Sequence, residues 1–385
     1  MIRLTIPCLD ATDFAAVEEV LASTYLVQGT RVAAFEVEMA RRVGVAHAVA
    51  VSNGTAALHL ALLALAVCPG DLVVVTAYSW PATANAVELC GAQPVFVDIE
   101  PDTYNLDPVK LADTLRGLMG NPATAPRVRA IMPVHAFGQS ADMSAILECA
   151  DRHGLPVIED AACAIGARWM DRPAGAMGRL GCFSFHPRKA VTTGEGGMIT
   201  TSDAGLARAL RALRNHGLDP DAGAPDFIMP GFNYRLTEFQ GALGLTQLAK
   251  LDDLINQRRS RAAVYDALLA GEAVKAPVVR AAAEAVYQSY VVQLPASAAP
   301  RRADIIASLK ANGIETTIGT WHIPMTNFYR NRYGFGPGEF PATDQVFHSS
   351  LTLPLHHRLT LSEQRFVVEQ LILAVNKEQP KRLAG

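Results

Sequence analysis

Between residues 45 and 201 the chain alternates short apolar segments with helix-like segments, and this alternation limits the fold more than any other feature of the sequence. The apolar segments are continuous runs rich in Val and Ile, which is typical of strands buried on both faces of a sheet. Strands separated by helices favour an α/β domain with a mostly parallel sheet. The pattern predicts strands at 48–52, 72–78, 94–99, 129–135, 156–160, 182–186 and 197–201, and helices at 55–66, 82–90, 107–119, 141–153 and 203–215.

The second part of the chain has a different pattern. Residues 216–235 are rich in Gly, Pro, Asp and aromatic residues and predict a long loop, and 237–268 predict one long connecting helix. Strands at 287–294 and 315–317, with helices at 302–312 and 362–377, then indicate a smaller α+β domain. We therefore predict a large α/β domain over 1–245, including the N-terminal segment, and a connecting helix with a small domain over 246–385.

The composition excludes several classes of protein. Half of the 385 residues are hydrophobic and 18% are charged, so the chain is not a disordered one, and a net charge of −3 gives no basis for nucleic-acid binding. The apolar stretch 56–67 is about a dozen residues long, whereas a transmembrane helix needs about 20. The N-terminus also lacks the apolar core of a signal peptide, so we expect a cytoplasmic protein without a membrane partner.

The six cysteines contain no CxxC pair. Neither a disulfide framework nor a metal site is therefore expected, and we expect most of the cysteines to be buried.

Because ligands bind at the carboxyl ends of parallel strands, the polar residues after the predicted strands are candidate site residues. Segment 52–57 leads into a helix that starts at Gly54 and Thr55, and the free backbone N–H groups of this helix start could bind a phosphate. Alternatively, the segment only caps the helix. Segment 157–162 ends an apolar strand with two acids, the second being Asp160. A buried carboxylate there requires a cationic partner, unless it is solvated and caps the next helix.

Two further segments carry polar groups in loops. Segment 182–197 is the most specific: an apolar strand ends in a polar cluster that contains Lys189, and a Gly-rich turn follows. A partly desolvated lysine at a strand end suits Schiff-base chemistry, although most loop lysines are simply solvated. Segment 230–237 places Asn233 and Arg235 before the long helix, where they could bind a phosphate or carboxylate or only cap the helix.

Taken in order, these segments closely resemble the DegT/DnrJ/EryC1/StrS family of pyridoxal-phosphate-dependent sugar aminotransferases, from about residue 6 to residue 373. The resemblance rests on several blocks in the same order, including SNGTAALHLALLAL, PVHAFGQSADM, VIEDAACAIGA, CFSFHPRKAVTTGEGGMITT, LRNHG and GFNYRLTEFQGALG. It implies the aspartate aminotransferase-like fold, fold type I, with a large PLP-binding domain and a small C-terminal domain.

The resemblance also implies a cofactor, pyridoxal 5'-phosphate, and roles for individual residues. Lys189 would carry the cofactor as a Schiff base and move the proton, Asp160 would pair with the pyridine nitrogen, and Trp80 would stack on the ring. The phosphate ligands that it implies are Gly54, Thr55, Ser184 and, from the neighbouring subunit of a homodimer with shared active sites, Asn233.

Two segments depart from the family pattern. Cys163 stands three residues after Asp160, where relatives often have Gln or His near the ring hydroxyl, and a thiol is a weak hydrogen-bond partner. Residues 321–327 replace the usual run on the substrate side. The side chains best able to meet a substrate diphosphate are His322, Arg235 and Arg330.

The activity that the resemblance implies is transfer of an amino group from an amino acid, usually L-glutamate, to a keto sugar. We expect a nucleotide-linked 4-keto-6-deoxyhexose as the acceptor, in amino-sugar biosynthesis for lipopolysaccharide or antibiotics. The alternatives are a keto-cyclitol or another ketone without a nucleotide, and a non-catalytic regulator that binds a sugar nucleotide. Lys189 argues against the family branch that carries histidine at this position and performs a dehydration.

Overall fold

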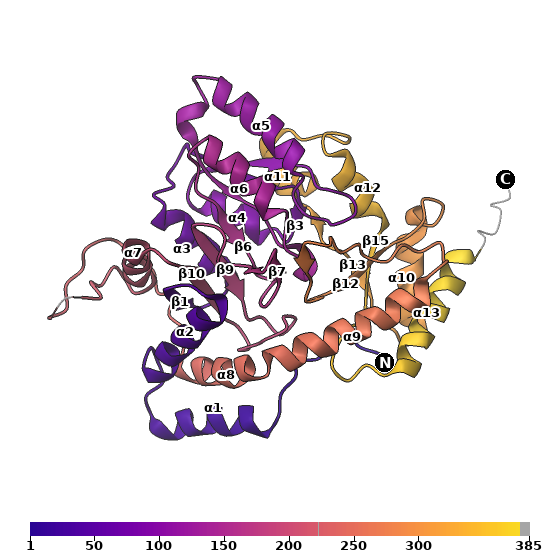
Figure 1. Ribbon diagram of the computed structural model, residues 1–385, viewed down its shortest axis with the longest axis horizontal. Helices are drawn as coiled ribbons and strands as arrows, with labels where there is room; N and C mark the ends of the chain where they lie inside the picture. Colours follow the sequence, from indigo (N-terminus) through magenta and orange to yellow (C-terminus); the bar gives the residue numbers. More distant parts are fainter. Residues whose placement is uncertain (222, 378–385) are drawn as a thin grey trace.

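The computed structural model describes residues 1–221 and 223–377, and a mixed sheet lies at the centre of the first part of the chain (Figure 1). The strands, in their order across this sheet, are β4 (Gln93–Val97), β2 (Leu72–Thr76), β5 (Val128–Met132), β6 (Ile158–Asp160), β9 (Leu180–Ser184), β10 (Gly197–Thr201) and β1 (His47–Val51). Two isolated parallel bridges join the β5 segment to β6. Only β10 runs antiparallel to its neighbours, so the predicted α/β class with a mostly parallel sheet is confirmed.

Helices cover both faces of the sheet because alternate residues of each strand point to opposite sides. In β2, Val73 and Val75 pack in one core with α3 and α4, whereas Leu72 and Val74 pack in another with α5 and α6. The helices on the first face are α3 (Gly54–Ala64), α4 (Ala82–Leu89) and α7 (Ala204–Arg214). Those on the second face are α5 (Pro108–Gly120), α6 (Met143–Arg152), α2 (Thr30–Val43) and α8 (Glu238–Ala249).

Several boundaries and elements differ from the sequence predictions. The predicted single helix over 237–268 is wrong: α8 ends at Ala249, and α9 (Leu251–Leu269) begins in a new direction after Lys250 (Figure 1). No Gly or Pro lies at this break, so no helix-breaking residue indicates it in the sequence. Helices α2 and α1 (Ala11–Ser23) lie in the N-terminal segment, for which no helix was predicted; α1 begins with a capping box at Asp10.

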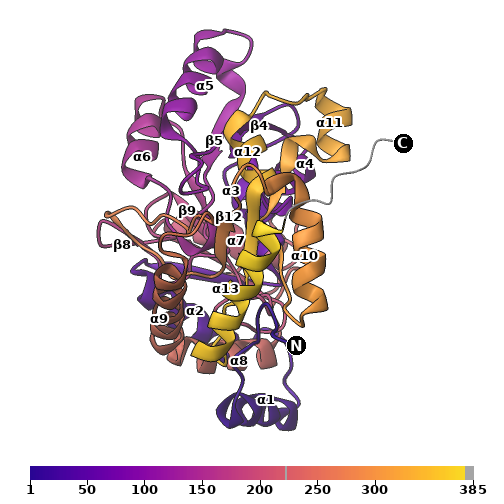
Figure 2. The same ribbon diagram turned by 90° about the vertical axis from the view of Figure 1, so that its right-hand side faces the viewer.

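The C-terminal part builds its own core around a short antiparallel sheet. That sheet has the order β12 (Tyr290–Gln293), β15 (Ser350–Leu353) and β13 (Thr317–Ile318), and β15 was not predicted. Helices α10 (Arg302–Ala311) and α13 (Leu361–Asn376) pack together beside this sheet, and α13 also packs against α9 (Figure 2). Because α9 contributes to this core and to the core of the large sheet, a domain boundary at 245 and 246 stays a prediction.

The remaining elements are short. They are β3 (Tyr78–Ser79), β7 (Arg168–Trp169), β8 (Arg172–Pro173), β11 (Ala283–Glu284), β14 (Trp321–His322), α11 (Asn327–Tyr333), α12 (Pro341–Ser349) and 3-10 turns at Ala125–Arg127, Ala136–Gly138, Ala299–Arg301 and Ile323–Met325. Among the described helices, none has the length and apolar character needed to cross a membrane. All six cysteines are free, but only Cys90, Cys149 and Cys182 are buried, so the expectation that most would be buried is wrong.

Candidate active site

The carboxyl ends of β6 and β9 bring together the polar residues that the sequence singled out. Asp160 is the last residue of β6, and Ser184 is the last residue of the neighbouring strand β9. The loop after β9 carries Lys189, and the start of α3 packs against β9. Residues that lie far apart in the sequence therefore form one cluster at this edge of the sheet.

The start of α3 forms a cradle for an anion. Asn53 caps the helix by accepting a hydrogen bond from the amide of Ala56 at 2.8 Å. The amides of Gly54 and Thr55 lie in the first turn, where no carbonyl of the helix is available four residues earlier. They are therefore free donors at the positive end of the helix. A Cβ added to Gly54 would lie 2.8 Å from Cβ of Ser184 and 3.2 Å from its hydroxyl, which shows how closely the helix start approaches that side chain.

The two acids at the end of β6 have different environments. Glu159 is fully buried and its carboxylate accepts hydrogen bonds from the amides of Gly175, Met177 and Gly178. His135 contacts the same carboxylate at 2.9 Å through Nε2, while its Nδ1 accepts from the amide of Ala141, so Nε2 carries the proton. Glu159 is thus a structural acid that fixes the 174–178 loop.

Asp160 keeps acceptor capacity for another group. Its carboxylate accepts from the hydroxyl of Thr83 at 2.8 Å and from the amide of Ala162 at 3.2 Å. Burial raises the pKa of Asp160, and these two hydrogen bonds and the charge of Lys189 only partly oppose that effect. A buried carboxylate with a raised pKa is stabilised by a further cationic hydrogen-bond donor. A protonated pyridine nitrogen is such a donor.

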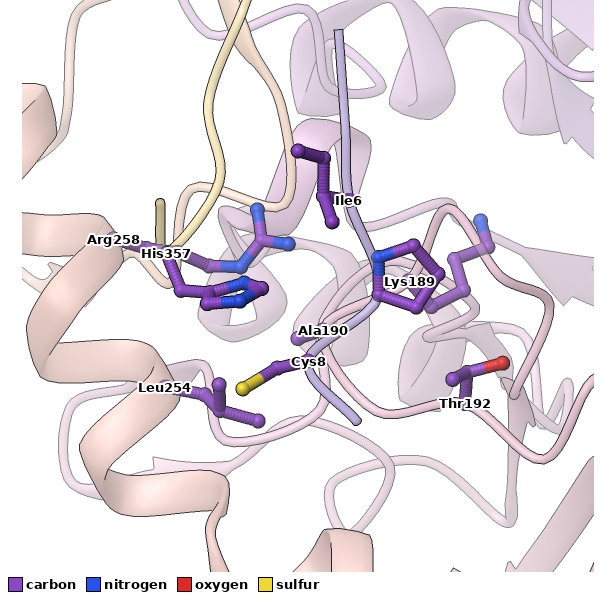
Figure 3. A pocket seen from close by; sticks show the side chains of 9 residues that line it. Ile6, Cys8, Lys189, Ala190, Thr192, Leu254, Arg258 and His357 are labelled. Atoms are coloured by element: carbon purple, nitrogen blue, oxygen red, sulfur yellow. The ribbon is translucent and has the colours of Figure 1, made fainter. Parts of the chain in front are cut away.

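The amine of Lys189 lies beside the thiol of Cys163. Nζ of Lys189 donates to Sγ of Cys163 at 3.0 Å, and both side chains are partly buried. On its other side the Lys189 backbone lines a small pocket with Cys8, Arg258 and His357 (Figure 3). In that view the Lys189 side chain extends away from Arg258 and His357, so its amine belongs to the Asp160 side of the loop.

Trp80 stands at the rim of the cluster. It is 63% exposed, and it follows β3, which pairs antiparallel with β14 so that Trp321 lies opposite Ser79. Thr83, the hydrogen-bond partner of Asp160, is one helical turn beyond Trp80. The pairing of β3 with β14 therefore brings the 319–322 segment of the C-terminal part next to this rim.

Asn233 and Arg235 flank Tyr234, whose carbonyl accepts a hydrogen bond from the amide of Ser52 at 2.8 Å. Asn233 is exposed, and its backbone forms a bridge with Asn215 at the end of α7. Arg235 donates to the side-chain oxygen of Asn215 at 2.7 Å. No described contact joins either residue to the Lys189 cluster of its own subunit.

The other two substrate candidates occupy different environments. His322 is buried, with Nε2 3.2 Å from a carboxylate oxygen of Asp344 and its ring packed edge-on against Phe340 and Phe347. Arg330 is exposed on α11. The structure thus brings together Gly54, Asp160, Cys163, Ser184 and Lys189. His322 pairs with Tyr78 near the Trp80 rim, whereas Arg330 lies on α11.

The sequence analysis missed Thr83, whose hydroxyl is the closest side-chain partner of Asp160. It lies inside a predicted helix rather than after a strand, so the search for polar strand ends could not find it. A threonine on an apolar helix that covers a strand end is the only signal that the sequence offers.

Comparisons with known proteins show the family and the fold of the chain. A sequence model of the DegT/DnrJ/EryC1/StrS aminotransferase family matches residues 7–372. A GDP-perosamine synthase from Caulobacter vibrioides is 42% identical over 318 residues, which is 82% of this chain and 83% of the relative. A solved aminotransferase of the family from Brucella abortus is 32% identical, has a TM-score of 0.88 and covers 95% of this chain and 96% of its own. The solved 3-amino-5-hydroxybenzoic acid synthase is 30% identical, with a TM-score of 0.87 over 96% of this chain and 97% of its own.

Proposed function

The chain belongs to the DegT/DnrJ/EryC1/StrS aminotransferase family, and from this premise we propose that it transfers an amino group from L-glutamate to a nucleotide-linked 4-keto-6-deoxyhexose. The observation that supports this proposal best is the cluster at the ends of β6 and β9, where an amine, a buried carboxylate and a free helix start converge. An aminotransferase of this family needs all three groups to use pyridoxal phosphate.

The residues present fit pyridoxal phosphate. The amides of Gly54 and Thr55 and the hydroxyl of Ser184 would hold the phosphate, because they form a donor set at the positive end of α3. Asp160 would hold the pyridine nitrogen in its protonated form, since its buried carboxylate lacks a full cationic partner. Trp80 would cover the ring, and Lys189 would bind the aldehyde carbon. When bound, the cofactor supplies an electron sink for the carbon that gains or loses the amino group.

The protein's own groups would then handle charge and protons. Thr83 and Ala162 fix the orientation of the Asp160 carboxylate, so the cofactor nitrogen meets an acceptor that is already in place. The Lys189 amine, once free, is the base nearest to this centre and can move a proton between the donor or acceptor carbon and the cofactor. Glu159 takes no part in this chemistry, because its acceptors are already used by the 174–178 loop and His135.

The proposed acceptor rests on the relatives rather than on the cluster. The name of the 42% identical relative, GDP-perosamine synthase, specifies a product linked to a nucleoside diphosphate. This supports a nucleotide-linked acceptor for the present chain. The carbonyl at C4 of a 6-deoxyhexose and L-glutamate as the donor are part of the same proposal.

A second candidate acceptor has an observation in its favour. The 3-amino-5-hydroxybenzoic acid synthase has the same fold at 30% identity, and the compound in its name carries no nucleotide. A keto-cyclitol or another free ketone is therefore the alternative acceptor for this chain.

The test is a direct comparison of acceptors. The purified enzyme, with pyridoxal phosphate and L-glutamate, is given nucleotide-linked 4-keto-6-deoxyhexoses, the same sugars without the nucleotide, and keto-inositols, and 2-oxoglutarate formation is measured. We expect kcat/KM for the best nucleotide-linked sugar to exceed that for the free ketones by at least about a hundredfold, because diphosphate contacts contribute to binding. Equal turnover of the free ketones would overturn the nucleotide proposal in favour of the alternative.

A further inference from the structure

Cys163 is placed where its sulfur meets the one amine that the proposed chemistry requires. It lies in the turn after β6, three residues beyond Asp160, and Lys189 reaches it from the loop after β9. The Nζ–Sγ distance is 3.0 Å, which is well within the range of a hydrogen bond that involves sulfur.

The two other cysteines that are not buried, Cys8 and Cys68, have different surroundings. Cys68 is exposed, and its thiol donates to the carboxylate of Asp71 at 3.3 Å, which raises the pKa of Cys68. Burial raises the pKa of Cys8. Among the cysteines of the described residues, only the sulfur of Cys163 has a hydrogen bond from a cationic side chain.

We propose that Cys163 and Lys189 share a proton as a thiol–amine pair, so that Cys163 is the reactive thiol of the cofactor-free enzyme and the local base that frees the Lys189 amine for the cofactor. The pair has two forms with the same number of protons, ammonium with thiolate and amine with thiol. In the first form the sulfur is a nucleophile; in the second the amine is. Transfer of the proton from nitrogen to sulfur frees the amine without release of a proton to solvent.

The charges around the pair allow both forms. The carboxylate of Asp160 faces Lys189 and favours the ammonium, whereas partial burial favours the form without charge separation. His186 and Arg188 precede Lys189 in the same loop, and Glu195 lies within electrostatic reach of His186. Burial, with the charges of Lys189 and Arg188, lowers the pKa of His186 even though Glu195 opposes the effect, so His186 adds little positive charge near the pair at neutral pH.

The first test uses alkylation and does not require transamination. The full-length enzyme, with and without bound cofactor, is treated with iodoacetamide at pH 7, and each cysteine is quantified by mass spectrometry. The thiolate attacks the reagent carbon, a C–S bond forms, iodide leaves and the proton stays on the Lys189 amine. Without cofactor we expect Cys163 to react at least about tenfold faster than the more exposed Cys68, because an adjacent ammonium raises the thiolate fraction.

Matched variants assign the effect to the pair. Lys189→Met should reduce the alkylation rate of Cys163 by about tenfold or more and leave Cys68 unchanged, since the cation is lost. Lys310→Met, at an exposed lysine in the last turn of α10, should change neither rate. Alkylation of Cys163 that is slower than that of Cys68 in the cofactor-free wild type, or that is unaffected by Lys189→Met, would overturn the proposal. The buried Cys90, Cys149 and Cys182 should stay unreactive in the variant, which shows that it is folded.

The second test rests on the proposed function, because it follows cofactor uptake. The rate at which the cofactor-free enzyme develops a visible absorbance band with pyridoxal phosphate is measured between pH 7 and pH 9. We expect a shallow pH dependence in the wild type. In Cys163→Ala and Cys163→Ser the rate should rise by about tenfold per pH unit, because the Lys189 amine must then lose its proton to solvent before it can react. Equal pH profiles would exclude Cys163 as the local base.

The two tests separate this proposal from the proposed function. If the enzyme takes up no pyridoxal phosphate, the function proposal fails, and the alkylation rates alone still decide whether the thiol–amine pair exists.

Discussion

Two consecutive carboxylates at the end of β6 illustrate how neighbouring residues of the same type acquire different roles. Successive residues of a strand point to opposite faces of the sheet, so Glu159 and Asp160 enter different surroundings. The Glu159 carboxylate is saturated by three backbone amides and His135, whereas Asp160 has two donors and a raised pKa. Only Asp160 can therefore bind an additional cation without breaking existing hydrogen bonds.

Asp160→Asn should leave the cofactor bound but reduce turnover strongly. An amide cannot keep a pyridine nitrogen protonated, and loss of one charge from a buried pair costs about 3–5 kcal/mol, so kcat should fall by at least about a hundredfold. The measurement is kcat together with the visible absorbance of the bound cofactor. Near-normal turnover would mean that Asp160 serves only to cap the turn through the amide of Ala162.

The sequence indicated Asp160 and Lys189 because polar residues after apolar strands have no packing role in a buried sheet, whereas Ser184 was implied only by the family resemblance. The same logic could not separate Glu159 from Asp160, since the first amide that donates to Glu159 is that of Gly175, 16 residues later along the chain. The Lys189–Cys163 contact was also out of reach, because it depends on the parallel pairing of β6 with β9. Functional residues at strand ends could be predicted from the sequence. Their hydrogen-bond partners from distant parts of the chain could not.

At the scale of elements, the break between α8 and α9 has a function in packing that the sequence pattern does not reveal. At the break, Lys250 forms ion pairs with Asp10 and Asp13, and Gln247 and Thr246 donate to Asp13 as well. These contacts attach α1 to the α8–α9 corner. Helical periodicity continues through 237–268, and the partners of the corner come from the first thirteen residues of the chain, so local sequence could not predict it.

Asp13→Asn should loosen α1. Burial alone would raise the pKa of Asp13, but hydrogen bonds from Lys250, Thr246, the Asp10 amide and Gln247 outweigh it and hold the pKa below its usual range. A lowered pKa means that the carboxylate stabilises the fold above the unfolded pKa of about 4, and that this contribution disappears as the pH falls through the folded value. At pH 7 the variant should lose about 1–3 kcal/mol of unfolding free energy.

The measurement is thermal unfolding together with hydrogen exchange of the peptide that covers α1, at pH 7 and at a pH below about 3, which lies beneath the unfolded pKa of about 4. The difference between variant and wild type should be largest at pH 7 and shrink at the lower pH. Asp253→Asn is the control, because Asp253 is exposed in the first turn of α9 and its loss should cost less than about 1 kcal/mol. Faster exchange along α1 that does not depend on pH would argue against a role for the Asp13 charge.

At the scale of the whole molecule, apolar side chains remain exposed in two regions that the sheet and its cores do not use. One comprises Phe14 and Leu21 of α1 with Tyr25, Leu26 and Val27 in the segment before α2. The other is the loop between α7 and α8, which extends from the body of the molecule (Figure 1) and exposes Phe227 and Ile228. Exposed apolar surface of this kind fits a second copy of the chain, as does the half-hydrophobic composition.

The same loop carries Asn233, and its position supports shared active sites in a homodimer. The return segment is fixed to α7, because the amides of Phe232 and Tyr234 donate to the carbonyls of Leu213 and Arg214. Asn233 is thereby held with its side chain exposed. In a dimer, Asn233 would complete the phosphate site of the partner, so each site would need groups from both chains.

Mixing two impaired variants tests this arrangement. Lys189→Ala and Asn233→Ala subunits, unfolded and refolded together or exchanged at low concentration, should regain about a quarter of the wild-type activity, because random pairing restores one complete site in half of the dimers. Lys189→Ala mixed with Asp160→Asn is the matched control and should regain nothing, since Lys189 and Asp160 act in the same subunit. Activity and the fraction of hybrid dimers, measured by native mass spectrometry, are read on the same sample. If hybrid dimers form and the first mixture stays inactive, Asn233 serves the fold of its own subunit and the sites are not shared.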